Sequence, residues 1–333
     1  MMNCRIAVVG ATGMVGRMFL TILEEHGVKA DYTLFASSKS AGTKLPFFGK
    51  EYVVSELKED SFLNQGFSYA LFSAGGSISA AFAPLAAASG AIVIDNSSQW
   101  RMDPDVPLVV PEVNPEALVS IPKGIIANPN CSTIQAVVPL KALDDAFHIR
   151  RIVYSTYQAV SGAGQKGYQD LEDGLCGALP KKFPHPIANN CIPHIDVFLE
   201  NGNTKEEQKM IDETRKILSR PDLRISATCV RVPVYHGHSE SINVEFDRPF
   251  EIDEVRRLLE STEGVVVSDD PKNNVYPMPI EAAGTDPVYV GRIRRDTSVE
   301  NGLNFWCVAD NIRKGAALNA VQILELLIKG EKR

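Results

Sequence analysis

The feature that most constrains the fold is a glycine-rich turn close to the start of the chain. The motif GATGMVG at 10–16 follows the apolar run 5–10 and precedes a helical stretch that extends to about Glu25. Glycines in such a turn let the backbone approach a pyrophosphate, whose charge the helix N-terminus meets. The alternative is a tight turn without a ligand, but a strand before and a helix after the motif favour dinucleotide binding. The expected cofactor contacts here are Gly10, Thr12, Gly13, Met14, Val15 and Gly16.

The segment 36–42, after the second predicted strand, bears on which dinucleotide binds. NAD sites usually place an Asp or Glu there, which accepts a hydrogen bond from the ribose hydroxyl. Here the segment reads ASSKSAG, with hydroxyls and one cation but no carboxylate. The alternative is a polar loop after an edge strand, but this chemistry suits a 2′-phosphate and favours NADP. The expected contacts are Ser37, Ser38, Ser40 and Ala41.

Hydrophobic patterning predicts two different sheets. Short β-rich runs at 5–10, 32–37, 67–74, 91–97, 108–114 and 124–130 alternate with helical stretches such as 79–89, which is typical of a parallel sheet covered by helices. A longer strand is expected at 149–160, mostly loop at 161–190 and an amphipathic helix at 204–219. High β-propensity at 225–247 and 289–309 indicates a mixed or antiparallel sheet, and 312–330 forms a closing helix.

The predicted fold class is therefore α/β. We expect an N-terminal Rossmann-like doubly wound sheet and an α+β catalytic and dimerisation domain with a mixed sheet. The NADP-binding domain is expected to comprise residues 1–130 with 311–333, because the closing helix returns to it. Residues 131–310 form the second domain.

Composition excludes several classes of function. The 333 residues carry a formal net charge of -7, which argues against nucleic acid as a partner. No apolar run reaches the roughly 18 to 20 residues of a membrane span, and no signal peptide is recognisable, so we expect a cytoplasmic protein. Six cysteines without a CxxC pair predict no disulfide framework. Cys191 and His194 have a spacing that zinc could use, but no second pair completes a site, so no metal is expected.

Cys131 is the candidate nucleophile. It lies in NPNCST at 128–133, between a predicted strand and the helical run 134–143. A helix N-terminus favours the reactive thiolate, whereas the alternative is a small buried cysteine. Beside a nicotinamide ring, a thiolate adds to an aldehyde, hydride leaves for the cofactor and a thioester remains. Water, coenzyme A or phosphate must then attack the thioester.

Six motifs occur in an order and spacing that together resemble one family. They are GATGMVG at 10–16, SSQWR at 97–101, NPNCST at 128–133, YQAVSGAG at 157–164, EEQK at 206–209 and RVPVYHGHS at 231–239. The chain resembles the aspartate-semialdehyde dehydrogenases over essentially its whole length.

The resemblance implies roles for individual residues. The implied catalytic groups are the acyl-forming nucleophile Cys131, the general acid/base His238 and the substrate-orienting Gln158. Binding of the substrate carboxylate and amino group is implied for Arg231 and Glu206. Phosphate binding is implied for Arg101 and Lys209, with Asn130 nearby. Cofactor contacts near the nicotinamide are implied for Ser161, Gly162 and Asn311.

The residues by themselves leave alternatives open for several of these roles. Glu206 and Lys209 are three apart on a predicted helix, which a solvated ion pair also explains. Arg101 alone would be interpreted as a surface charge. His236 shares a loop with His238, and spacing cannot choose between the two imidazoles. Arg231 suits a carboxylate because its guanidinium binds such groups bidentately.

The implied activity is the reversible, NADP-dependent, phosphorylating oxidation of L-aspartate 4-semialdehyde to 4-phospho-L-aspartate, with inorganic phosphate as the second substrate. In cells the reductive direction would supply lysine, through diaminopimelate, as well as threonine and methionine. A homodimer is expected. The alternatives are N-acetyl-gamma-glutamyl-phosphate reductase, whose cysteine motif typically reads Asn-Pro-Gly-Cys, malonyl-CoA reductase, and a non-catalytic NADP-binding regulator, which would have lost the nucleophile or the base.

Overall fold

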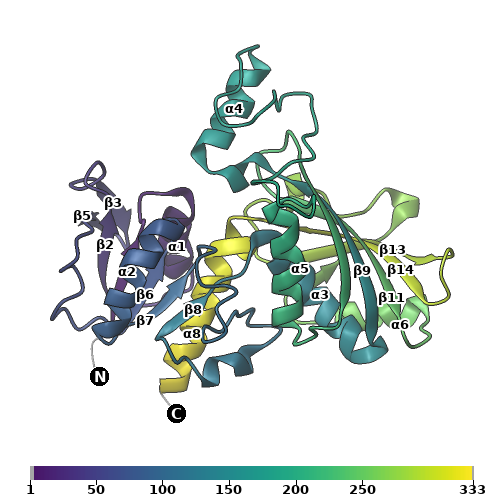
Figure 1. Ribbon diagram of the computed structural model, residues 1–333, viewed down its shortest axis with the longest axis horizontal. Coiled ribbons are helices and arrows are strands. Elements are labelled where there is room, and N and C mark those ends of the chain that lie inside the picture. The colour runs from purple at the N-terminus through teal and green to yellow at the C-terminus, as the bar shows by residue number, and fades with distance from the viewer. Residues whose placement is uncertain (1–3, 332–333) are drawn as a thin grey trace. The chain divides into compact units, whose positions relative to one another are not determined.

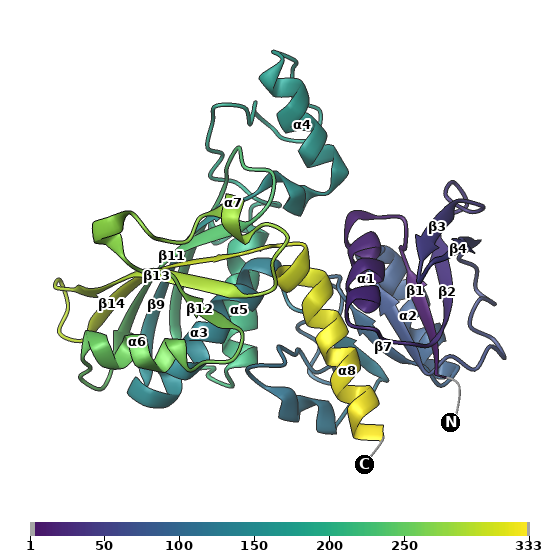
Figure 2. The same ribbon diagram turned by 180° about the vertical axis from the view of Figure 1, so that it is seen from behind.

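The computed structural model describes residues 4–331 and divides into two compact units (Figures 1 and 2). Unit 1 contains the described residues up to Pro129 together with those from Ala316 onward. Unit 2 extends from Asn130 to Gly315. Each unit is built around its own six-stranded sheet.

Unit 1 contains a parallel sheet with the strand order β5-β2-β1-β6-β7-β8. The strands are β1 (Arg5–Val9), β2 (Asp31–Ala36), β5 (Ser55–Glu56), β6 (Tyr69–Phe72), β7 (Ile92–Asp95) and β8 (Ile125–Ala127), with a separate hairpin of β3 (Lys44–Phe47) and β4 (Lys50–Val53). The strand order reverses between β1 and β6. Ligands of open parallel sheets bind at the carboxyl ends of the strands beside such a reversal. The glycine turn follows β1 and is therefore at the expected position.

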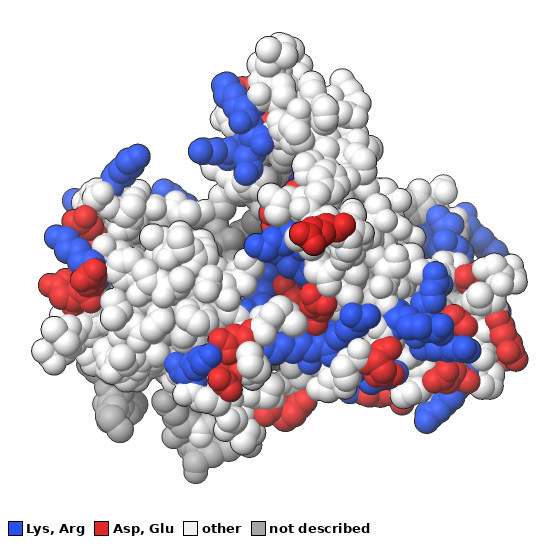
Figure 3. All heavy atoms as spheres, viewed as in Figure 1, with Lys and Arg blue, Asp and Glu red and all other residues white. Residues whose placement is uncertain are grey.

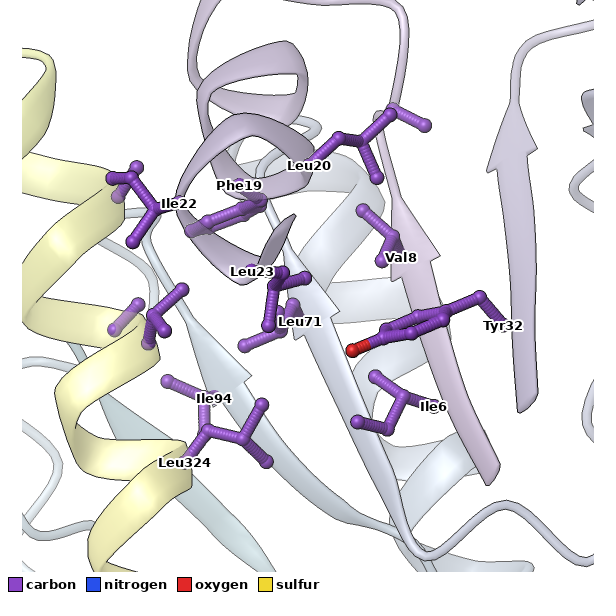
Figure 4. Close-up of a cluster of buried hydrophobic side chains, with 14 of the residues drawn as sticks. Ile6, Val8, Phe19, Leu20, Ile22, Leu23, Tyr32, Leu71, Ile94 and Leu324 are labelled. Carbon is purple, nitrogen blue, oxygen red and sulfur yellow. The ribbon is translucent and has the colours of Figure 1, made fainter. Parts of the chain in front are cut away.

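Three helices cover this sheet. Helices α1 (Met14–Glu25) and α8 (Asn319–Glu331) lie on one face, and α2 (Gly76–Ala88) lies on the other (Figures 1 and 2). The apolar residues of α1 recur at helical spacing and are buried. Figure 4 shows Phe19 and Leu23 of α1 with Leu324 of α8 and Ile94 of β7 in one core cluster. This burial explains why the last helix of the chain packs in unit 1.

Unit 2 contains a mixed sheet with the strand order β10-β9-β11-β14-β13-β12. The β10–β9 and β12–β13 pairs are parallel, and the other pairs are antiparallel. The strands are β9 (Ile149–Gln158), β10 (Arg224–Arg231), β11 (His238–Phe246), β12 (Val265–Val267), β13 (Val288–Asp296) and β14 (Gly302–Ala309). Helices α3 (Cys131–Phe147), α5 (Lys205–Ile217) and α6 (Ile252–Glu260) pack against one face of this sheet.

No long helix packs on the opposite face of the unit 2 sheet within the described residues, although the segment before the short α7 (Pro279–Ala282) reaches Trp306, whose Nε1 atom donates to the Pro277 carbonyl at 3.1 Å. Along β9 the side chains alternate, so that Ile152 and Tyr154 are buried and Val153 and Tyr157 are more exposed. The Tyr157 and Trp306 rings lie together on the exposed side, with centroids 5.4 Å apart.

The remaining elements of the chain are η1 (Pro115–Val119), η2 (Val160–Ala163), α4 (Gln165–Leu175), η3 (Pro271–Asn273) and the π-helical η4 (Arg313–Leu318).

The α/β fold class with a parallel and a mixed sheet is confirmed, but one local prediction is wrong and another missed a helix. Residues 108–114 do not form a strand and make only a single bridge, between Leu108 and Ala127. The Asn114 side chain accepts from the Val110 N–H and donates to the Leu108 carbonyl, both at 2.9 Å, and Pro111 has no N–H to donate. These side-chain hydrogen bonds fold the segment into a turn.

Residues 161–190 were expected to be mostly loop, and 176–190 is a loop, but the expectation missed α4. Gly167 and Gly174 weaken the helical signal of this segment in sequence. In the structure a Cβ on Gly167 would lie 2.6 Å from the Val160 carbonyl oxygen, so the glycine allows α4 to pack closely on η2. The Asp170 carboxylate also accepts from the backbone N–H of Phe183 at 2.9 Å, which holds the following loop against α4.

Acidic and basic side chains are interspersed over the face of unit 2 that Figure 3 shows. Within residues 4–331, no helix is long and apolar enough to cross a membrane. Unit 2 also contains buried charged side chains, and several of them lie around the N-terminus of α3.

Candidate active site

Cys131 is the first residue of α3, and Asn130 is its N-cap. The Asn130 Oδ1 atom accepts from the backbone N–H groups of Ser132 and Thr133 at 3.0 and 3.3 Å, while its own N–H donates to Glu213 at 2.6 Å. The cap fixes where the helix begins, so the partly buried Cys131 lies in its first turn. This position favours a thiolate through the helix dipole.

Glu206 of α5 is the centre of a buried hydrogen-bond network. Its Oε1 atom accepts from Asn130 Nδ2 at 2.8 Å and from Gln158 Nε2 at 3.1 Å, and its Oε2 atom accepts from Lys209 Nζ at 3.0 Å. Burial opposes ionisation, but Lys209, Asn130 and Gln158 lower the pKa of Glu206 to about 2. Glu206 is 6% exposed, so this is an anion in a buried network and not the solvated surface pair that the spacing also allowed.

Lys209 is held as a cation by two carboxylates. Its Nζ atom donates to Asp196 at 2.9 Å as well as to Glu206. Burial opposes its charge, but Glu206 and Asp196 raise the pKa of Lys209 above its usual range. Sequence analysis missed Asp196, which lies in a loop 13 residues before Lys209 and carries no periodic signal.

Arg231 ends β10 beside Gln158, its register partner on β9. Only 5% of this residue is exposed, and its Nη1 atom donates to the Ala159 carbonyl at 2.6 Å. Its Nε atom is buried without a hydrogen-bond partner among the described residues. Burial lowers the pKa of Arg231, although a guanidinium remains charged at any physiological pH. A buried cation with an unused N–H suits an anionic ligand.

His238 begins β11 and is fully buried. The Ala159 backbone N–H donates to its Nδ1 atom at 3.0 Å, and Gln135, one turn after Cys131, donates to its carbonyl at 3.2 Å. Burial and then the Arg231 charge lower the pKa of His238 to about 3, against an opposing effect of Glu206. His238 therefore belongs to the same buried group of side chains as Arg231 and Glu206.

His236, the alternative imidazole, is partly exposed, and its ring lies 5.6 Å from that of Tyr168. The sequence spacing could not separate the two histidines, but their surroundings do. Of the two, only His238 shares the Ala159 peptide with Arg231.

The other expected site residues of unit 2 gather in η2 and after β14. Ser161 and Asn311 hydrogen bond through their side chains, and Asn311 Oδ1 accepts from the Gly237 N–H at 3.0 Å. A Cβ on Gly162 would lie 2.9 Å from Arg231 Nη1 and 3.2 Å from His238 Cε1. Only glycine lets these two side chains approach the turn so closely.

The glycine turn of unit 1 has the geometry of a phosphate site. Gly10 has a φ of +84°, and a Cβ there would clash with the Ser73 carbonyl, while a Cβ on Gly16 would clash with the Gly10 carbonyl. Gly13 caps α1 without a side-chain hydrogen bond, so side-chain capping does not use the first N–H groups of the helix. The turn after β2, from Ser37 to Ala41, is mostly exposed and contains no carboxylate. These residues fit a dinucleotide.

Arg101 belongs to unit 1. It is not the surface charge that the residue taken alone suggested in the sequence. It is 7% exposed, with Nε donating to the Asn128 carbonyl at 2.9 Å and Nη2 donating to the Asn96 carbonyl at 3.0 Å. Both carbonyls follow the carboxyl ends of strands, β8 and β7 respectively.

Sequence analysis also missed buried carboxyl groups of unit 2, among them Glu213 and Glu240. Glu213 lies seven residues after Glu206 on α5, so helical periodicity could have found it. Glu240 lies two residues after His238 on β11, so strand alternation could have found it. Glu240 is completely buried, and Gln135 is the side chain that opposes the effect of burial on its pKa.

The comparisons with known proteins all identify semialdehyde dehydrogenases. The family "Semialdehyde dehydrogenase, NAD binding domain" matches residues 5–121, and "Semialdehyde dehydrogenase, dimerisation domain" matches residues 140–314. An aspartate-semialdehyde dehydrogenase of Aquifex aeolicus is 58% identical over 98% of this chain and 99% of its own.

Two solved structures extend this similarity. Aspartate semialdehyde dehydrogenase II of Vibrio cholerae, complexed with ASA, has a TM-score of 0.95 and 46% identity, and the match covers 99% of each chain. The enzyme of Candida albicans, solved with NADP, has a TM-score of 0.78 and 27% identity, and the match covers 98% of each chain.

A nucleotide-binding sheet followed by a mixed-sheet unit with a cysteine at a helix start defines a semialdehyde dehydrogenase. Within that class, identity near 50% over almost the whole chain is decisive. The chain belongs to the aspartate-semialdehyde dehydrogenase family.

Proposed function

We propose that this chain catalyses the reversible, NADP-dependent, phosphorylating oxidation of L-aspartate 4-semialdehyde to 4-phospho-L-aspartate, through a thioester on Cys131. In the cell it would work in the reductive direction, in the cytoplasm, toward lysine, threonine and methionine. The observation that carries the proposal is the cluster around the α3 N-terminus. It combines a helix-start cysteine, a buried Arg231 with an unused N–H, and the buried Glu206 anion.

The substrate carries a carboxylate and an ammonium group, and the cluster offers one partner for each. Arg231 would bind the carboxylate through its guanidinium. Glu206 would accept from the ammonium group, because a carboxylate has about four lone-pair sites and three of its contacts are already described. Lys209, and Arg101 of unit 1, would bind phosphate or the acyl phosphate, with Asn130 holding the network in place.

Cys131 would attack the carbonyl carbon as a thiolate. Gln158 would orient the substrate, because its amide is fixed by Glu206 on one side and its Oε1 accepts from Thr156 at 3.1 Å on the other. His238 would act as the general acid/base through its unpartnered Nε2 atom. The thioester formed on the sulfur is then attacked by inorganic phosphate, which releases the acyl phosphate and the free thiolate.

The proposed cofactor is NADP, which when bound takes up or supplies the hydride. The glycine turn would hold its pyrophosphate and Ser37, Ser38, Ser40 and Ala41 its 2′-phosphate. Ser161, Gly162 and Asn311 would contact its nicotinamide end. The lack of a carboxylate after β2 and the NADP bound to the Candida albicans relative support this choice.

The proposed assembly is a homodimer that forms through the uncovered face of the unit 2 sheet. That face lies almost entirely within the stretch that matches the dimerisation-domain family. Its half-exposed aromatic and aliphatic side chains, among them Tyr157, Trp306 and Val153, support an apolar contact.

The test is the absorbance of NADPH formed from L-aspartate 4-semialdehyde and NADP, with and without inorganic phosphate. Wild type and Cys176→Ala, which removes an exposed cysteine outside the cluster, should both reduce NADP only when phosphate is present. Cys131→Ala should show no such reduction. Phosphate-independent turnover, or a fully active Cys131→Ala, would contradict the proposal. Activity only with N-acetylglutamate semialdehyde or malonyl-CoA would assign the chain to one of the neighbouring activities.

A further inference from the structure

Two asparagines at the carboxyl ends of adjacent strands hold the side chain of Arg101. Asn96 follows β7 and Asn128 follows β8, and the last residues of these strands, Asp95 and Ala127, are register partners. The Asn96 carbonyl accepts from Arg101 Nη2 at 3.0 Å, and the Asn128 carbonyl accepts from Nε at 2.9 Å. Two acceptors on two strands fix the plane of the guanidinium, which a single contact would leave free to rotate.

The side chains of the same two asparagines are bonded to each other. Asn128 Nδ2 donates to Asn96 Oδ1 at 2.8 Å and to the Ala316 carbonyl at 3.0 Å. Asn128 Oδ1 accepts from Asn319 Nδ2 at 2.8 Å. Asn128 is completely buried, and both hydrogens of its amide are used within unit 1. The amide therefore links the two peptides that hold Arg101 to each other and to the start of α8.

This amide link lies where the backbone ladder between β7 and β8 ends. The last ladder contact runs from the Asn128 N–H to the Asp95 carbonyl at 2.8 Å. The next carbonyls along the two chains, those of Asn96 and Asn128, accept from Arg101. Past the end of a ladder, backbone pairing no longer sets the spacing of two chains. The bond between the asparagine side chains sets it instead.

The orientation of Arg101 matters because of how a guanidinium binds an oxyanion. Arginine presents its N–H groups in one rigid plane, so the direction of that plane decides which of them reach a phosphate. The two carbonyls are neutral acceptors, so their contacts orient the guanidinium without adding a negative charge beside it. The asparagine pair is thus suited to aim a cation at an anionic ligand.

We propose that Asn96 and Asn128 are positioning residues for phosphate, which fix the orientation of the Arg101 guanidinium and do not contact the phosphate themselves. This inference rests on the proposed function, from which it takes the role of Arg101. Without the amide link, the two carbonyls would no longer be held at one spacing, and the guanidinium would lose its fixed plane.

The first measurement is the KM for inorganic phosphate in Asn96→Ala and Asn128→Ala, followed as NADPH formation. Hydrogen bonds to charged groups contribute enough that weakening one should raise this KM by about tenfold. A loss of binding confined to one substrate raises only the KM of that substrate. We therefore expect kcat at saturating phosphate, and the KM values for L-aspartate 4-semialdehyde and NADP, to stay close to wild type. A fall in kcat with an unchanged KM for phosphate would overturn the inference.

A double-mutant cycle with Arg101→Lys separates positioning from general damage. Lysine keeps the positive charge but has no planar fork for the two carbonyls. If the asparagines act through Arg101, then Asn96→Ala and Asn128→Ala should not raise the KM for phosphate further in the Arg101→Lys background. Equal increases in both backgrounds would contradict the inference. Equilibrium dialysis with ³²P-labelled phosphate measures the same contrast as a dissociation constant and does not require turnover.

Gln99→Ala is the matched control. Gln99 lies in the same turn as Asn96 and Arg101, but its side chain is exposed, so the KM for phosphate should equal that of wild type. Asn96 is only partly buried, so Asn96→Ala carries the test even where Asn128→Ala fails to fold. An Asn96→Ala enzyme with the phosphate kinetics of Gln99→Ala would refute the role of the pair. Wild type without phosphate-dependent turnover would instead reject the proposed function, and this inference with it.

Discussion

Glu206 and Glu240 are two buried carboxyl groups of unit 2 whose pKa values shift in opposite directions. Burial favours the neutral acid in both. Around Glu206 it is outweighed by Lys209, Asn130 and Gln158, whereas around Glu240 only Gln135 opposes it and the charge of Glu206 reinforces it. Burial therefore raises the pKa of Glu240 well above its usual range. The partners of the two glutamates, and not their residue type, therefore shift the two pKa values in opposite directions.

Glu240→Gln should flatten the pH dependence of stability. The folded protein keeps a proton on Glu240 that the unfolded chain releases above about pH 4.3, so wild type loses stability as pH rises from there toward the folded pKa. The difference in unfolding free energy between variant and wild type should change by up to about 1.4 kcal/mol per pH unit in that window. Urea unfolding at pH 5, 6, 7 and 8 measures it. Glu245→Gln, on the less buried side of β11, is the control, and parallel curves for all three proteins would refute a neutral Glu240.

At the scale of elements, α5 is the scaffold of the buried hydrogen-bond network around Glu206. It presents Glu206, Lys209 and Glu213 on one face at helical spacing. A capping box starts the helix: Thr204 Oγ1 accepts from the Glu207 N–H at 3.3 Å, and Glu207 Oε2 accepts from the Thr204 N–H at 2.6 Å. Because Glu206 lies in the first turn of α5, this cap determines the position of its carboxylate.

Thr204→Ala should lower stability more than it lowers activity. Loss of a buried N-cap costs about 1 kcal/mol, which denaturant unfolding would detect. Glu206 keeps its hydrogen bonds to α3 and β9, so kcat should fall less than about threefold, a change worth roughly 0.7 kcal/mol. Thr204→Ser retains the hydroxyl and should resemble wild type. A variant with normal stability but a large loss of kcat would mean that the box serves catalysis and not helix stability.

Elements also show where local signals are enough. The first helix, the strand at 149–158 and the helix at 205–217 follow from periodicity because each has one apolar face. The turn at 108–114 and helix α4 do not, because their structures depend on the Asn114 side chain and on the space that Gly167 leaves for η2. Neither contact is visible in a window of neighbouring residues.

At the scale of the whole molecule, the proposed dimer depends on the uncovered face of the unit 2 sheet. Val153 lies on β9, within that face and away from the Cys131 cluster at the other side of the sheet. Val153→Glu should weaken association, because a two-fold interface would bury the new charge twice. Sedimentation at micromolar concentration should show a shift from dimer toward monomer.

Val119→Glu is the matched control for that experiment. Val119 lies in η1 of unit 1 and is 91% exposed, so the same substitution should leave association unchanged. If Val153→Glu sedimented like Val119→Glu and wild type, the assignment of this sheet face to the dimer would be wrong.

By itself, the sequence determined the features whose cause is local: a glycine turn between a strand and a helix, a cysteine at a helix start, and two regions with different hydrophobic patterning. Motifs in a set order also identified the family. Only the tertiary structure decided the electrostatic surroundings of the site residues. Asn130 meets Glu206 across 76 residues and Ala159 meets His238 across 79. The lowered pKa of Glu206, the raised pKa of Glu240 and the lowered pKa of His238 depend on such distant partners, because burial makes ionisation depend on the few groups in contact.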